Sequence, residues 1–191
     1  METINMEGPV SIKEILAQLD GKFPMDEAVV EALPQGTTFQ SVENFGTSAW
    51  TITGRVMAIE LDGTETPYFL KIAYGEHGGT MLRGEFESSK IIRELMPRIH
   101  PEARQIWQSS KYRTQPLTFI FQNSSKWMSK PLLIRRSSLA GSQRCTRASQ
   151  SPTGQFGFHV ATCDGKLAHT VEWEESWAVF YRKLLRWRLQ T

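Results

Sequence analysis

The spacing of apolar residues changes along the chain from a helical period to a strand period. Ser11 to Glu14 forms a capping box ahead of apolar residues at helical spacing, which predicts a helix over residues 11–20. The stretch MDEAVVEAL, residues 25–33, predicts a second, shorter helix. Apolar and polar residues then alternate in FQSVENFG, TITGRVMAIELDG and YFLKIAYG, which are separated by glycine-containing turns. We therefore predict three antiparallel strands after these helices.

The pattern returns to a helical period in the second half of the chain. TMLRGEFESSKIIRELM, residues 80–96, predicts a helix that ends at Pro97. Later, the turn signals SPTG and CDGK flank QFGFHVAT, which fits either a short strand or a loop. WEESWAVFYRKLLRWRL then predicts a helix with one wide aromatic face. We interpret that face first as core, and its members are Trp173, Trp177, Phe180, Leu184 and Trp187.

Composition allows one domain, or one domain and part of another, because 40% of the 191 residues are hydrophobic. No apolar run approaches the ~18 residues of a membrane span, and METINMEGPV lacks the basic and apolar regions of a secretory signal. Cys145 and Cys163 have neither CxxC spacing nor histidines at zinc-site intervals. We expect a cytoplasmic protein with free thiols, no metal site and no membrane partner.

The charge is distributed unevenly, although the net charge is only +2. Residues 103–147, which we call the basic block, contain nine Lys or Arg residues and no Asp or Glu. The rest of the chain has 13 basic and 20 acidic residues and a net charge of −7. Such a block can be a functional insert that binds nucleic acid. A second interpretation of it is given below.

Three features in a fixed order indicate a nucleotide site. Lys71 stands late in the third predicted strand, where its ammonium could lie beside the α and β phosphates of a nucleotide, and Glu85 in the following helix could hold it there. The turn that contains Gly46 and Ser48 could let backbone N–H groups approach the phosphates. Each feature alone also has an ordinary structural explanation, as an edge lysine, a hairpin turn or a solvated helix carboxylate. We assign no catalytic residue.

The stretches PYFLKIAYGEHGGTMLRGEFES, SQSPTGQFGFHVATCDGK and WEESWAVFYRKLLRW resemble the fructosamine-3-kinase and ketosamine-3-kinase family, most closely its fungal protein-ribulosamine 3-kinase-like members. The resemblance covers about residues 35–100 and 148–189. It implies a protein-kinase-like fold, ATP with Mg²⁺, and phosphorylation of the sugar 3-hydroxyl of ribulosamine or fructosamine adducts on protein lysines. It also implies that Lys71 anchors the nucleotide with Glu85 as its helix partner, and that the nucleotide loop contains Gly46 and Ser48. Structural or substrate-lining roles are implied for Phe156, Phe158, Trp173 and Trp177.

The sequence departs from the family pattern in two ways. The motifs HGDLWxGN and DP, which carry the catalytic and metal-binding aspartates of the family, do not occur in it. The basic block also replaces an acidic and apolar hinge that ends in leucine-histidine-lysine. Read one nucleotide out of frame, residues 141–147 permit RLAALHK and residues 126–138 permit MDVEAPPDPEKF. We therefore interpret the block as frameshifted or mis-spliced text with a poorly ordered backbone.

The sequence thus predicts an α+β fold with a protein-kinase-like small lobe, an antiparallel sheet plus a helix, and an incomplete large lobe. The expected parts are an N-terminal helical segment at 1–34, the small lobe at 35–102, the basic block at 103–147, and the start of a truncated large lobe at 148–191. The predicted function is that of an ATP-dependent ketosamine kinase, inactive in this chain for lack of both aspartates. The alternative is a non-catalytic fragment that binds nucleotide weakly or binds nucleic acid through a basic insert. Nucleic acid is the less favoured of these two partners.

Overall fold

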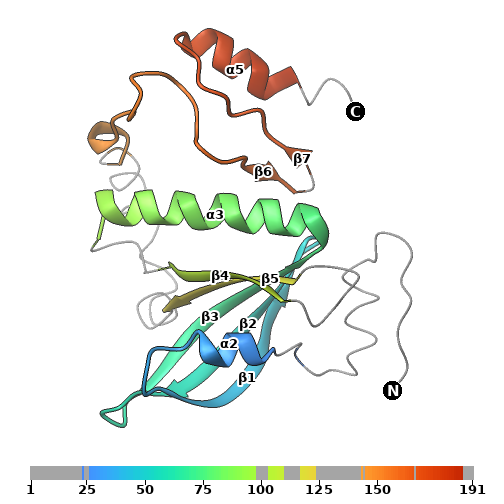
Figure 1. Ribbon diagram of the computed structural model, residues 1–191, viewed down its shortest axis with the longest axis vertical. Coiled ribbons are helices and arrows are strands. Elements are labelled where there is room, and N and C mark those ends of the chain that lie inside the picture. The colour runs from blue at the N-terminus through green and yellow to red at the C-terminus, as the bar shows by residue number, and fades with distance from the viewer. Residues whose placement is uncertain are drawn as a thin grey trace.

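The computed structural model describes residues 23, 26–97, 103–109, 117–123, 143, 145–165 and 167–186. Its main element is a five-stranded antiparallel sheet in the order β1-β2-β3-β5-β4. The strands of this sheet are β1 (Thr38–Thr47), β2 (Thr51–Ile59), β3 (Glu65–Tyr74), β4 (Ala103–Ser109) and β5 (Leu117–Asn123). The remaining elements are α2 (Glu27–Glu31), α3 (Gly75–Leu95), β6 (Cys163–Asp164), β7 (Leu167–Ala168) and α5 (Trp177–Arg186). Helix α3 lies between the large sheet and the part of the chain that contains β6, β7 and α5 (Figure 1).

The first three strands form where the period of two predicted them. The β2–β3 register runs from Thr51 opposite Ala73 to Ile59 opposite Glu65. The tight turn between these strands contains Gly63, whose φ of 81° lies in the left-handed region that favours glycine. The three predicted antiparallel strands are confirmed.

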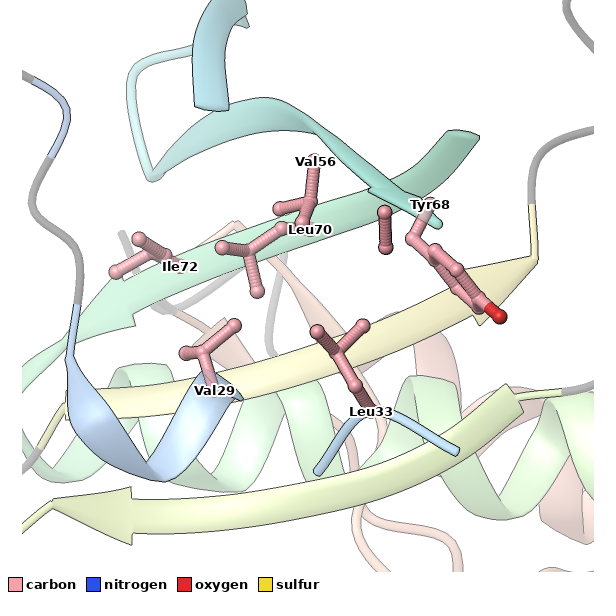
Figure 2. Packing of buried hydrophobic residues seen from close by; sticks show 7 residues of the cluster. Val29, Leu33, Val56, Tyr68, Leu70 and Ile72 are labelled. Atoms are coloured by element: carbon pink, nitrogen blue, oxygen red, sulfur yellow. The ribbon is translucent and has the colours of Figure 1, made fainter. Parts of the chain in front are cut away.

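One face of β2 and β3 packs against α2 to form the main core (Figure 2). Alternate residues along a strand point to the same face, so the apolar positions of both strands meet the helix together. The buried members of this cluster are Val29, Leu33, Val56, Ala58, Tyr68, Leu70 and Ile72. Asp26 caps α2 by accepting a hydrogen bond from the Ala28 N–H at 2.9 Å. The predicted second helix is confirmed.

Helix α3 covers the opposite face of the sheet and begins at Gly75, earlier than the predicted residue 80. Glycines at positions 78 and 79 have low helix propensity and concealed this first part of the helix. Packing explains Gly78, because a Cβ there would lie 2.9 Å from the carbonyl carbon and Cβ of Ala73. Leu82 is fully buried against Ala73. The helix ends before Pro97, as predicted.

The basic block contributes two strands to the sheet. β5 pairs with β3 from Tyr68 opposite Asn123 to Tyr74 opposite Leu117, and β4 pairs with β5. Residues 143 and 145–148 are helical. The described parts of the block thus take strand and helix conformations, and the expectation of a poorly ordered backbone stays a prediction for the block. LTFIFQN is rich in residues that favour strands, and the main-chain groups along β3 need hydrogen-bond partners. The out-of-frame interpretation stays a prediction, because main-chain order does not test it.

Helix α5 begins at Trp177, later than the predicted residue 173. The N–H groups of Phe156 and Glu174 donate to each other's carbonyl oxygens at 2.8 Å, so the chain is extended here rather than helical. Of the predicted CDGK turn, Cys163 and Asp164 form β6, and Gly165 follows them before β7. The predicted helix over 11–20 and Trp187 lie outside the described residues.

The expected thiol and membrane properties can be compared with the described residues. Cys145 and Cys163 are both free cysteines. Burial raises the pKa of the Cys163 thiol. None of the helices in the described part of the chain has the length and apolar character needed to cross a membrane.

Candidate functional site

Lys71 and Glu85 meet between the sheet and α3. The Lys71 Nζ donates to Glu85 Oε2 at 2.7 Å. Because strand residues alternate, Lys71 lies on the face opposite the buried Leu70 and Ile72 and so faces α3. The side chains are 23% and 36% exposed, so water screens this pair less than a pair on open surface. The predicted contact is present, and its role toward a nucleotide stays a prediction.

Packing of α3 on β3 directs Glu85 toward Lys71. Leu82 precedes Glu85 by three residues, and side chains at this spacing lie on nearly the same helix face. The buried Leu82 therefore turns Glu85 toward the sheet. Glu87 points elsewhere and accepts from Lys90 at 3.1 Å. That hydrogen bond lowers the pKa of the Glu87 carboxyl, with a smaller contribution from His159.

Gly46 lies near the end of β1, beside the β1–β2 turn. Its φ of 143° lies in a region that favours glycine. Its N–H donates to Asn44 Oδ1 at 2.9 Å, and its carbonyl oxygen accepts from Thr53 Oγ1 at 3.0 Å. Thr53 is also paired in register with Lys71. Gly46 is therefore linked to the strand position beside the lysine.

Ser48 closes the β1–β2 turn. Its N–H donates to the Thr51 carbonyl at 2.8 Å. Its Oγ accepts from the N–H groups of Trp50 at 3.1 Å and Thr51 at 3.0 Å. These contacts give Ser48 a role in shaping the turn, which the resemblance did not specify.

Aromatic and cationic side chains that the sequence analysis missed lie on the sheet near Lys71. Phe69 is two residues before Lys71 on β3, and its ring meets that of Phe45 edge to face at a centroid distance of 6.4 Å. Arg55 is paired in register with Phe69 and contacts Glu43 at 3.2 Å. Its Nε is buried and has no hydrogen-bond partner among the described residues. The period of two could have shown that Phe69 shares a face with Lys71.

The segment before α5 packs on α3 beside Glu85. A Cβ added at Gly84 would lie 2.6 Å from the Ala161 carbonyl oxygen, so the chain crosses the helix at van der Waals contact. His159 Nε2 lies 3.5 Å from Glu87 Oε2 on the same helix. The sequence analysis missed Gly84, because a glycine inside a helix gives no periodic signal.

The aromatic residues before and within α5 contact one another. Trp177 lies within ring-contact distance of Phe156, Phe180 and Tyr181. Its side chain is 53% exposed, so the interpretation of the aromatic face as core is wrong for this residue. Trp173 instead packs on Gly157, where a Cβ would lie 2.8 Å from the tryptophan Cα.

Ionic contacts add to the attachment of α5. Lys183 on this helix contacts Glu174, and its Nζ lies 3.4 Å from Glu172 Oε2. The hydrogen bond with Glu174 raises the pKa of the Lys183 ammonium. No group of three or more His, Cys, Asp or Glu side chains that could hold a metal ion occurs within the described ranges.

The five-stranded antiparallel sheet, with a helix on each face, defines a mixed α+β fold. No family model and no curated protein matches the sequence. A crystal structure from Haemophilus somnus 129PT, described as "Putative fructosamine-3-kinase", is similar to this chain with a TM-score of 0.59 and 18% sequence identity. The similarity covers 94% of this chain and 52% of that chain. At this identity the likeness shows a shared fold, and this chain spans about half the length of the Haemophilus somnus protein.

Proposed function

We propose that this chain carries the nucleotide-holding part of a protein-kinase-like ketosamine kinase. The observation that supports it most directly is the 2.7 Å contact between Lys71 on β3 and Glu85 on α3. In kinases of this type a strand lysine binds the α and β phosphates, and a helix glutamate holds that lysine in place. The fold shared with the Haemophilus somnus protein supports the same assignment. The proposed substrates of such a kinase are ribulosamine or fructosamine adducts on protein lysines, and the sugar 3-hydroxyl would accept the phosphate.

The residues near Lys71 fit a nucleotide. The Arg55 guanidinium lies on the same sheet face as Lys71, because Arg55 is paired in register with Phe69, and it adds positive charge near the proposed phosphate position. The rings of Phe45 and Phe69 offer an apolar surface to a base. Bound ATP would supply the transferable phosphoryl group, and Mg²⁺ would neutralise its charge. Lys71 and Glu85 would orient the phosphates.

We further propose that the 191-residue chain holds ATP without transferring its phosphate. The sequence contains neither HGDLWxGN nor the DP motif. A carboxylate that orients the sugar hydroxyl and another that holds Mg²⁺ are both needed for efficient transfer. The 191 residues would then bind the nucleotide without either of these carboxylates.

Isothermal titration with MgATP tests the binding step. Lys71→Met should weaken ATP binding about tenfold or more, since a hydrogen bond to a charged group contributes about 1.5–3 kcal/mol. Lys90→Met is the matched control, because Lys90 lies on α3 at the protein surface, paired with Glu87, and should leave the affinity unchanged. Absence of ATP binding by the unmodified chain, or equal affinity in both variants, would refute the nucleotide site.

A transfer assay tests the second part of the proposal. Radiolabelled ATP is incubated with the purified chain and a peptide that carries ribulosyl-lysine. We expect no labelled peptide, because the aspartate motifs are missing from the sequence. Labelled phosphate on the sugar would contradict the proposed inactivity and would leave the nucleotide site in place.

A further inference from the structure

Trp50, in the β1–β2 turn, contacts the β6–β7 turn, although the two are far apart in the sequence. A Cβ added at Gly165 would lie 2.9 Å from Trp50 Cε2 and 3.0 Å from both Cζ2 and Nε1. Gly165 has a φ of 59°, in the left-handed region. The absence of a side chain thus serves two purposes here, because it permits the turn and makes room for the indole.

The chain that leads into and out of the same hairpin is fixed to α3. A Cβ at Gly84 would lie 2.6 Å from the Ala161 carbonyl oxygen and 3.1 Å from Thr162 Cα. The Thr162 carbonyl accepts from the His169 N–H at 2.7 Å, which closes the base of the hairpin. Gly84 directly precedes Glu85 on the helix. One hairpin therefore contacts both the β1–β2 turn and the part of α3 that carries the glutamate.

We propose that the contact between Trp50 and Gly165, which we call the clasp, positions the β1–β2 turn relative to the Lys71–Glu85 pair and so raises nucleotide affinity. This inference rests on the proposed function, since the turn and the pair are the two parts of the proposed nucleotide site. The hydrogen bonds of Ser48 lie within the hairpin itself and shape it locally. The clasp adds a contact with the segment packed on α3.

Loss of the clasp should weaken binding through conformational entropy. A turn that is held before the ligand arrives loses little freedom on binding, whereas a released turn must be ordered by the ligand. We expect about tenfold weaker MgATP binding when the turn is released, which is the size of effect that ordering one residue produces. Lys71 and Glu85 themselves remain in contact in this state.

Gly165→Ala is the direct test, and Gly154→Ala is its matched control. Both glycines have positive φ, 59° and 72°, so alanine strains the backbone at either position. A Cβ at Gly154 would meet nothing within 4 Å, whereas a Cβ at Gly165 would displace Trp50. The full chain is examined in both variants by amide hydrogen exchange at Ser48 and Thr51 and by MgATP titration.

We expect Gly165→Ala to speed exchange at Ser48 and Thr51 and to weaken MgATP binding about tenfold, and Gly154→Ala to leave both as in the unmodified chain. Trp50→Ala removes the other half of the clasp without backbone strain and should reproduce the Gly165→Ala result, which keeps the test decisive if Gly165→Ala does not fold. Trp50→Phe should restore part of the effect, because an aromatic ring can still lie on the glycine.

The two measurements separate failure of the clasp from failure of the nucleotide site. Unchanged exchange in Trp50→Ala would overturn the clasp itself. Faster exchange with unchanged MgATP affinity would overturn its role in positioning the turn. If the unmodified chain does not bind MgATP, the proposed function fails and the role in affinity fails with it, while the exchange rates still decide whether Gly165 and Trp50 hold the turn.

Discussion

The Lys71–Glu85 contact should appear as a coupling energy in the folding stability of the chain. The perturbations are Lys71→Met, Glu85→Gln and the double substitution, compared in a double-mutant cycle. Exposed ion pairs contribute about 0.2–1 kcal/mol, and breaking a fully buried pair costs about 3–5 kcal/mol. With an N–O distance of 2.7 Å and side chains 23% and 36% exposed, the pair lies between these limits but nearer the first. We expect a coupling energy of about 1 kcal/mol.

The assay is urea unfolding followed by circular dichroism, with the free energy of unfolding extrapolated to water for each variant. The matched control is the Arg55–Glu43 pair, whose N–O distance is 3.2 Å and whose side chains are 37% and 61% exposed. Its greater exposure predicts a coupling of about 0.3 kcal/mol. High salt should reduce the control coupling more strongly, because screening acts mainly on exposed charges. A Lys71–Glu85 coupling no larger than that of the control would refute the argument from burial.

Three further predictions concern the core, the pH dependence and the approach of α3 to the sheet. Leu70→Ala should lower the free energy of unfolding in urea by about 2–5 kcal/mol, and Val30→Ala, at a largely exposed position, by less than about 0.5 kcal/mol. The hydrogen bond from Lys90 lowers the pKa of the Glu87 carboxyl in the folded chain. The ionised carboxylate therefore stabilises the fold at pH values above its ordinary pKa of 4.5, and this stabilisation is lost as the pH falls through the pKa of the folded state. The stability difference between the unmodified chain and Glu87→Gln should therefore shrink as the pH falls below 4.5 in urea titrations, and a constant difference would contradict it. Gly78→Ala should lower the thermal midpoint of unfolding, although alanine raises helix propensity by about 1 kcal/mol. The reason is that its Cβ would lie 2.9 Å from the backbone of β3. A raised midpoint would show that α3 can move away from the sheet without loss of stability.

Elements whose two faces differ in burial could be predicted from the sequence. Strand β2 alternates buried and half-buried residues from Ile52 to Ile59, and the polar Thr53 and Arg55 on either side of Gly54 show this alternation in its first half. The Lys71–Glu85 contact could also be predicted, because a strand followed directly by a helix places few residues between them. Local sequence patterns were sufficient to predict contacts between elements that follow one another in the chain.

Contacts between distant segments could not be predicted in this way. At three glycines another segment comes so close that a side chain would not fit, and these are Gly84, Gly157 and Gly165. The pattern of apolar residues along the chain gives no sign of these close approaches. The start of α5 was misplaced because Trp173 has helical spacing to Trp177, yet the chain is held extended there by a partner in the Phe156 region. In each case a tertiary contact overrides a local preference.

The strands within the basic block bear on the origin of its sequence. A strand ladder is formed by main-chain N–H and C=O groups, which all residues except proline supply in full, so β5 can pair with β3 whether or not its codons are read in the ancestral frame. The acid-free composition of residues 103–147 and the strings recovered one nucleotide out of frame therefore remain the observations that support the frameshift interpretation. We expect the transcript to show one inserted or lost base near each edge of the block, with the acidic hinge restored in the corrected frame. A transcript from related strains that encodes residues 103–147 in the same frame, without any such change, would refute this interpretation.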